Sequence, residues 1–293
     1  MRDFNEFNIT GAVIERMADT PDPRLKCVMT SLVRHLHDFV RDVELSFAEW
    51  EAAIAFLTRT GKTCNEHRQE FILLSDTLGV SMLVDAINHR MPNGATETTV
   101  LGPFFVEEAP RIELGTDIAG GLQGQPLLVT GSMSSADGAP LAHATVHVWH
   151  ADDHGYYDVQ HFDVTGLAGR AKFETDVDGR FHFWSINPKW YPIPDDGPVG
   201  DMLKATRRHP NRPAHVHFMI AAPGYETLIT HVFASESPYL DSDAVFGVKN
   251  SLIATFASLP AGLAPDGRAM NEPYRRLHYD FGLKPTAGDL DSL

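Results

Sequence analysis

The first ninety residues carry apolar side chains at the three- and four-residue spacing of amphipathic helices. One such stripe follows the capping-box pair Ser46 and Glu49 and leads to Gly61, placed where a helix would end. A further apolar run extends from residue 66 to about residue 89, with Gly79 as a break. The first stripe consists of Leu25, Val28, Leu32, Leu36, Phe39, Val40 and Val43. The pattern therefore predicts a helical N-terminal region.

Beyond Pro92 the pattern changes to the alternation of β-strands, interrupted by Asn-Gly and Asp-Gly turn signals. Short strands joined by long loops rich in proline and glycine are typical of an antiparallel sandwich or barrel. We therefore expect a mainly β protein, with an α-helical region at 1–95 and an antiparallel β-sandwich at 96–293. The expected strands are 127–133, 144–149, 180–186, 215–221 and 228–233, and the turns are 93–94, 137–138, 178–179 and 196–197.

Composition places the chain among ordinary globular proteins. Of its 293 residues, 43% are hydrophobic and 22% are charged. The formal net charge of -15, from 24 basic and 39 acidic residues, argues against binding to nucleic acid. The N-terminal residues do not resemble a signal peptide, and no stretch approaches the roughly 18 apolar residues of a membrane span. Two cysteines cannot form a disulfide framework. We therefore expect a cytoplasmic protein with no membrane or nucleic-acid partner.

A His-x-His pair in one predicted strand is the first candidate for chemistry. His215 and His217 are two residues apart, so their side chains point to the same face of the strand and can reach one ion. Buried imidazoles are costly unless they are bonded to something. The pair alone leaves two interpretations open, a set of metal ligands or a structural pair.

Two tyrosine-containing loops favour the metal interpretation. One loop ends at Tyr156 and Tyr157, and the other places Tyr191 among prolines that restrict the backbone. Two imidazoles and two phenolates would form a hard, anionic site without thiolate, which suits ferric iron. Tyrosine ionises near neutral pH only beside a strong Lewis acid. The alternative is that Tyr191 is a loop tyrosine packed on the sandwich.

Over nearly its whole length the chain resembles the intradiol ring-cleaving dioxygenases, especially their hydroxyquinol 1,2-dioxygenase branch. This resemblance rests on the order of two tyrosines and a His-x-His pair, together with the sequence segments around them. These segments are LGPFF at 101–105, WHADDHGYYDVQ at 149–160, YPIPDDGPVGDML at 191–203, NRPAHVHFMIAAPGY at 211–225 and YLDSDAVFGVK at 239–249.

The resemblance implies one non-haem Fe(III) per subunit, bound by Tyr157, Tyr191, His215 and His217. Tyr191 and His217 match the axial positions of the family, and Tyr157 and His215 match the equatorial ones, with hydroxide completing the site. Tyr157 fits the family pattern better than its neighbour Tyr156, although the reverse assignment stays open at this point.

The resemblance also assigns catalytic roles. Tyr191 would leave the metal as substrate binds, and Arg212 would stabilise the anionic substrate carbon that oxygen attacks. The alternative for Arg212 is a salt bridge at the edge of the sandwich. His231 occupies a position where catechol-cleaving relatives carry glutamine, and its role stays open between a hydrogen-bonding group and a neutral pocket wall.

The substrate pocket implied by the resemblance contains one carboxylate. Asp76 follows three apolar residues, so it would lie beside an apolar surface and accept a hydrogen bond from a third ring hydroxyl. The alternative is an exposed acid in mid-helix or a cap for the following turn. The full set is Leu73, Asp76, Val100, Leu101, Gly102, Pro103, Phe104, Ile193, Pro194, Arg212 and Val245.

The function implied is cleavage of hydroxyquinol (benzene-1,2,4-triol) by O2 to 3-hydroxy-cis,cis-muconate, which tautomerises to maleylacetate. Catechol or a substituted catechol is the alternative substrate. The resemblance also implies that the helical region forms a homodimer interface with a bound phospholipid, without membrane attachment. The same apolar stripe could instead cover the chain's own sandwich.

Two other interpretations explain less of the sequence. A cupin-type ferrous dioxygenase would need a glutamate a few residues after His217, whereas the next acid is Glu226, and the tyrosines would have no role. A non-enzymatic β-sandwich binding module would use the histidines and Tyr191 as packing groups. Such a module predicts no iron and no dependence on Tyr191.

Overall fold

The computed structural model describes residues 2–66, 68–160 and 166–286. The described residues form two compact units, Met1–Lys62 and Thr63–Leu293. The division expected at residue 95 differs from this boundary, because the helices at 70–88 belong to the second compact unit. Compactness reports which elements pack together and not which of them serve catalysis, so the functional division at residue 95 stays a prediction.

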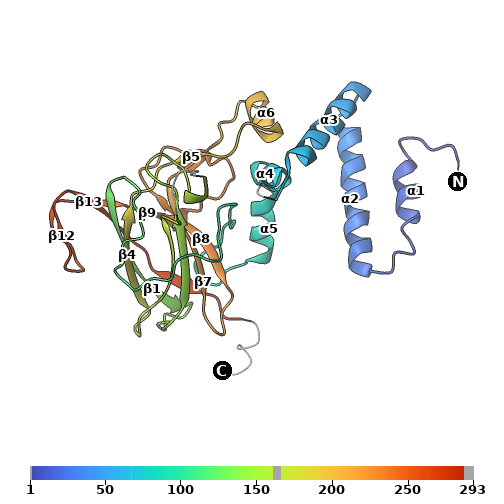
Figure 1. Cartoon of the computed structure of the whole chain (residues 1–293). Helices are drawn as coiled ribbons and strands as arrows, with labels where there is room; N and C mark the ends of the chain where they lie inside the picture. The colour runs from blue at the N-terminus through green and yellow to red at the C-terminus, as the bar shows by residue number, and fades with distance from the viewer. Residues whose placement is uncertain (1, 67, 161–165, 287–293) are drawn as a thin grey trace. The chain divides into compact units, whose positions relative to one another are not determined.

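The first unit is built from helices (Figure 1): α1 (Ile9–Glu15), α2 (Pro23–Asp42) and α3 (Phe47–Thr63). Asp22 caps α2 by accepting hydrogen bonds from the backbone N–H groups of Arg24 and Leu25. The predicted capping box is confirmed, since Ser46 and Glu49 bond to each other's backbone N–H. The helix end predicted at Gly61 is wrong: α3 continues to Thr63, and a glycine inside a helix costs only about 1 kcal/mol.

The apolar stripe predicted along α2 is present, and its side chains are about half-exposed. Its seven side chains each expose between 40% and 54% of their surface: Leu25, Val28, Leu32, Leu36, Phe39, Val40 and Val43. Large apolar side chains of α3, such as Trp50 and Ile54, are exposed to a similar degree. Contiguous exposed apolar surface on this scale is typical of an interaction site.

Two short helices begin the second unit, α4 (Glu70–Thr77) and α5 (Val80–Asn88). The break predicted at Gly79 is confirmed. Gly79 adopts φ +74, a left-handed conformation that lets the chain turn between the helices and that favours glycine.

Two five-stranded sheets form the rest of this unit (Figure 1). One has the order β3-β2-β7-β8-β9, and the other has the order β10-β13-β1-β14 with β4 also paired to β1. Their inward side chains share one core, in which Val129 and Phe183 of one sheet join Val148 and Phe218 of the other. The strands are β1 (Pro126–Ser135), β2 (Thr145–His150), β3 (Arg170–Glu174), β4 (Arg180–Ile186), β7 (His215–Ala221), β8 (Leu228–Ala234), β9 (Ile253–Ala254), β10 (Ala257–Leu259), β13 (Tyr274–His278) and β14 (Phe281–Leu283).

All five predicted strands are present, but the sheets are not purely antiparallel. Strands β13 and β14 both pair parallel to β1, and β9 pairs parallel to β8. Alternation of side chains shows which face of a strand is buried but says nothing about the direction of its neighbour. Here the chain returns to β1 from more than a hundred residues away, and a long return allows a parallel pairing.

The remaining elements are short and lie in the loops. They are β5 (Tyr191–Pro192), α6 (Pro198–Ala205), β6 (Asn211–Arg212), β11 (Gly262–Leu263), β12 (Ala269–Met270) and three 3-10 turns, Asp158–Gln160, Leu240–Ser242 and Asn250–Leu252. Of the helices in the described part of the chain, none is long and apolar enough to cross a membrane.

Candidate metal centre and active site

Strand β7 places two imidazoles on one side of its sheet. His215 and His217 are both buried, and His217 pairs across the sheet with Trp149 on β2 and His231 on β8. His215 Nδ1 lies 2.6 Å from the carbonyl oxygen of Pro213, so it donates a hydrogen bond there and leaves the Nε2 lone pair free to bind a cation. The indole of Trp149 stacks on His217 at 4.6 Å between ring centres, which fixes the plane of that imidazole.

The two loops bring phenol oxygens to the same place. Tyr157 exposes 1% of its surface whereas Tyr156 exposes 53%, so only Tyr157 points inward. Tyr191 is also buried, and its backbone pairs with that of Arg212 through β5 and β6. Gly155 adopts φ +88, and a Cβ there would lie 2.8 Å from the Cβ of Tyr191. The close approach of the two loops therefore requires glycine at this position.

The four side-chain atoms form a closed ring. The Tyr157 hydroxyl lies 2.8 Å from His217 Nε2 and 3.1 Å from the Tyr191 hydroxyl. The other two sides of the ring are Tyr191 hydroxyl to His215 Nε2 at 3.5 Å, and His215 Nε2 to His217 Nε2 at 3.1 Å. Two ligand atoms about 2.1 Å from one ion, at angles of 90–110°, are separated by about 3.0–3.4 Å. The ring therefore has the size of a metal coordination shell, and its two nitrogens and two oxygens, without sulfur, suit a hard cation such as ferric iron.

Burial keeps the two imidazoles and the Tyr157 phenol neutral when no cation is bound. Burial and the nearby charge of Arg212 lower the pKa of His215 to about 3, and burial with the neighbouring imidazoles lowers the pKa of His217 well below its usual value. Burial and the Tyr191 phenol raise the pKa of Tyr157 well above 10. The imidazoles are therefore ready to bind a metal, whereas the Tyr157 phenol needs a strong Lewis acid to ionise.

Arg212 lies beside this ring in a buried ion pair. Its Nε and Nη2 donate to the two carboxylate oxygens of Asp243 at 3.1 and 3.3 Å. Burial by itself lowers the pKa of Arg212, but Asp243 and the two site tyrosines outweigh burial and raise it. Burial raises the pKa of the Asp243 carboxyl, but the charge of Arg212 and its hydrogen bond outweigh burial and hold that pKa below its usual value. A guanidinium held in this way is a fixed positive charge next to the ring of phenols and imidazoles.

Asp76 is buried, with 9% of its surface exposed, so the alternative of an exposed helical acid is wrong. Burial raises the pKa of its carboxyl, and the Ser81 hydroxyl and the charge of Arg212 offset this only in part. A buried carboxyl is costly unless it is hydrogen-bonded, and Ser81 supplies one such bond here.

The other expected pocket residues fall into two groups. Leu101 and Phe104 pack around the site tyrosines, and Phe104 stacks on Tyr157 at 4.3 Å. Gly102 adopts φ +77, and a Cβ there would lie 3.2 Å from the His217 ring. Leu73, Ile193 and Val245 form a separate apolar cluster with Leu203 and Ala244, while Val100 and Pro194 are half-buried and Pro103 is exposed.

His231 is a third imidazole at the site. Its ligand atoms, with those of His215 and His217, all lie within 4.8 Å of one another. It is fully buried, and among the described residues its ring nitrogens make no well-formed hydrogen bond, although the backbone of Val100 lies near enough to favour its protonated form slightly. Burial and the neighbouring charges lower its pKa well below the usual value, so it is neutral.

Comparison with known proteins finds matching families over nearly the whole chain. A family described as "Dioxygenase" matches residues 100–285, and one described as "Catechol dioxygenase N terminus" matches residues 22–96. The chain belongs to the intradiol dioxygenase family.

Three relatives are similar over nearly their full length. A 6-chlorohydroxyquinol 1,2-dioxygenase of Cupriavidus pinatubonensis is 54% identical over 98% of this chain and 100% of its own. A hydroxyquinol 1,2-dioxygenase of Nocardioides simplex is 51% identical over 96% of each chain. The crystal structure of a hydroxyquinol 1,2-dioxygenase from Pseudomonas putida DLL-E4 superposes with a TM-score of 0.91, at 49% identity over 96% of this chain and 99% of that one.

Several residues that support the site were not predicted. In this dioxygenase the buried carboxylate of Asp158, directly after Tyr157, forms an ion pair with Arg170. Arg170 also donates to the carbonyl of Phe104 at 2.9 Å and so joins the two aromatic side chains that stack at the site. Asp243 lies within a segment that carried the resemblance, but its spacing gave no sign that it pairs with Arg212. Such pairs join distant segments, and no local pattern records them.

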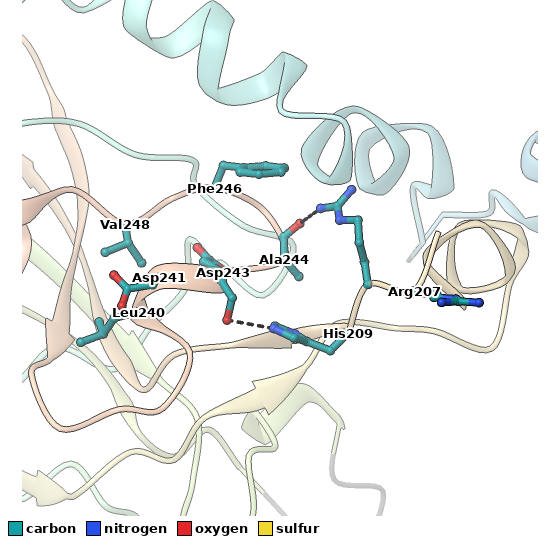
Figure 2. A pocket seen from close by; sticks show the side chains of 10 residues that line it. Arg207, His209, Leu240, Asp241, Asp243, Ala244, Phe246 and Val248 are labelled. Atoms are coloured by element: carbon teal, nitrogen blue, oxygen red, sulfur yellow. Dashed lines mark hydrogen bonds between the residues drawn. The ribbon is translucent and has the colours of Figure 1, made fainter. Parts of the chain in front are cut away.

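A pocket of about 450 Å³ adjoins the site (Figure 2). It is lined by residues of 207–209 and 240–248, with Asp241 and Asp243 on one side and His209 on the other. None of the four ring residues is among its lining residues, so Asp243, the partner of Arg212, is the group that it shares with the site.

Proposed function

We propose that this dioxygenase cleaves hydroxyquinol between its adjacent hydroxylated carbons, inserts both atoms of O2, and yields 3-hydroxy-cis,cis-muconate, which tautomerises to maleylacetate. The reaction adds O2 to the triol without any other reactant. The names of the relatives that match nearly end to end support this substrate over catechol. The observation that carries the proposal is the closed ring of two phenols and two imidazoles beside the buried Arg212.

We assign Tyr157, Tyr191, His215 and His217 as the ligands of one Fe(III) per subunit. Each of the four sides of the ring joins an atom of Tyr191 or His217 to an atom of Tyr157 or His215. Neighbouring ligand atoms of one metal ion are about 3.0–3.4 Å apart, so the spacing of the ring supports this set of ligands. Ferric iron in this set would act as a Lewis acid that ionises the two adjacent hydroxyls of the substrate.

The protein groups then have distinct roles. With iron bound and Tyr191 ionised, the Tyr191 oxygen would accept one proton from a substrate hydroxyl, while Tyr157 stays packed under Phe104. Arg212 stabilises the negative charge that the ionised ring carries toward O2. Asp76 accepts a hydrogen bond from the third hydroxyl, which catechol lacks. Leu73, Val100, Leu101, Gly102, Pro103, Phe104, Ile193, Pro194 and Val245 complete the substrate pocket.

The visible absorption spectrum tests the metal assignment. The purified protein is expected to show a broad tyrosinate-to-iron charge-transfer band that shifts when hydroxyquinol is added under nitrogen. A protein that stays colourless after reconstitution with ferric or ferrous iron would overturn it. Turnover then tests the substrate: hydroxyquinol is expected to be cleaved faster than catechol, and the reverse order would overturn that assignment alone.

We also propose that the chain forms a homodimer through its helical region. The seven exposed apolar side chains on one face of α2 support this, because a monomer would leave them in water. A phospholipid held at that interface, and location in the cytoplasm, remain expectations from the resemblance and from the composition. Analytical ultracentrifugation tests the dimer, and mass spectrometry of an organic extract of the purified protein tests the lipid. A monomer at micromolar concentration would refute the dimer.

A further inference from the structure

Arg208 joins two segments that lie far apart in the sequence. Its Nη1 donates to the carbonyl oxygen of Thr77 at 2.6 Å, and its Nη2 donates to the carbonyl oxygen of Ala244 at 3.1 Å. Thr77 directly follows Asp76, and Ala244 directly follows Asp243. One guanidinium therefore holds the backbone next to each of two buried carboxylates.

Both of those carboxylates lie near the charge of Arg212. Asp243 binds Arg212 directly, and the charge of Arg212 acts on Asp76, as does that of Asp243. Asp76 comes from α4, whereas Arg212 and Asp243 come from the loops that carry β6 and the 3-10 turn at 240–242. The position of Asp76 relative to Arg212 therefore depends on how α4 is attached to these loops.

Arg208 is well suited to make this attachment. Thr77 lies at the C-terminal end of α4, where carbonyl groups lack partners within the helix and a positive charge is favourable. The guanidinium of Arg208 also lies 5.0 Å from the centre of the Phe246 ring, which limits its freedom. A lysine could keep the charge but could not present two donors in one fixed plane.

The other end of α4 is held in a separate way. The buried Glu70 accepts a hydrogen bond from the backbone N–H of Val199 at 3.1 Å and forms an ion pair with Arg68. The start of α4 is therefore fixed without Arg208. Loss of Arg208 would release the end of the helix that carries Asp76 while the start stays attached.

We propose that Arg208 is a positioning residue for substrate selection, holding Asp76 at the place where it meets the third ring hydroxyl. The inference rests on the proposed role of Asp76 in recognising hydroxyquinol. It extends that role to a residue outside the pocket, which acts through the backbone of α4 and does not touch the substrate.

Steady-state kinetics of Arg208→Lys with hydroxyquinol and with catechol tests the proposal. We expect KM for hydroxyquinol to rise about tenfold, because a small displacement of a hydrogen-bonding group is costly, and KM for catechol to change by less than about twofold. The values of kcat and the charge-transfer band should change little, since Arg208 does not contact the four ring residues and Asp243 stays bonded to Arg212 and to the Gly247 backbone. Arg207→Lys is the matched control, because Arg207 is the adjacent arginine in the same pocket, and it should leave both KM values unchanged.

Asp76→Leu, which has a similar shape but no hydrogen-bond acceptor, separates failure of this inference from failure of the proposed function. If Asp76→Leu keeps full preference for hydroxyquinol over catechol, Asp76 does not recognise the substrate, and the basis for Arg208 is lost with it. If Asp76→Leu loses the preference and Arg208→Lys keeps it, only the role of Arg208 is overturned. The double variant should match Asp76→Leu within about twofold, and independent, multiplying effects would contradict an action through Asp76. Thermal melts of each variant identify losses caused by unfolding.

Discussion

The ion pair between Arg212 and Asp243 allows a quantitative test of the site. Asp243→Asn keeps the shape of the side chain and can still accept the hydrogen bond that the Gly247 backbone donates at 2.8 Å. It removes the negative charge that faces Arg212, both side chains being almost fully buried. A buried charge left without its partner costs about 3–5 kcal/mol.

This cost is measurable as a change in stability. For a unit of this size about 1 kcal/mol corresponds to about 2–4 °C, so the melting temperature should fall by roughly 6–20 °C. Calorimetry of the wild type, the single variant and the double variant Arg212→Gln/Asp243→Asn measures these melting temperatures. The double variant should regain most of the lost stability, because no unpaired charge remains buried, yet it should stay inactive for want of the guanidinium.

The pH dependence provides a second check. Arg212 lowers the pKa of Asp243 in the folded protein below the ordinary value of 3.8, so the stability from this pair is fully present above that pH. It is lost as the pH falls through the lowered pKa, where the folded protein takes up the proton. The stability difference between wild type and Asp243→Asn should therefore persist from pH 7 to about pH 4 and shrink at lower pH. Equal melting temperatures at pH 7, or a double variant as unstable as the single one, would refute this reasoning.

Three further predictions concern the metal site and the helices. Tyr191→Phe should keep part of its iron but lose about 10²–10³ in kcat, and an active variant would remove Tyr191 from proton transfer. Gly102→Ala should lower the iron content, because its Cβ would meet the His217 ring at 3.2 Å, whereas Gly121→Ala, with a similar positive φ and open space around it, should not. Leu36→Lys should shift the protein toward monomer in sedimentation, and Arg34→Gln on the opposite face of α2 should not. A loss of iron or of the dimer that the control variant shows as well would indicate general unfolding.

The sequence predicted the local elements of this site well. Period-two alternation identified β7 and, with it, the shared face of His215 and His217. Helical spacing identified α2 and the break at Gly79. These features depend on neighbours within a few residues, which the sequence displays directly. The order of tyrosines and histidines also indicated the family and, through the resemblance, the candidate ligands.

Only the tertiary structure decided how distant segments meet. The parallel pairing of β13 and β14 with β1 and the attachment of α4 by Arg208 each join residues more than a hundred positions apart. The burial of Asp76 likewise became visible only in the fold. The reason is physical: a local pattern shows which side chains avoid water, whereas the partner of a buried charge or strand is selected by packing over the whole chain. The sequence by itself therefore determined which residues could do the chemistry, and the fold determined how they are placed and held.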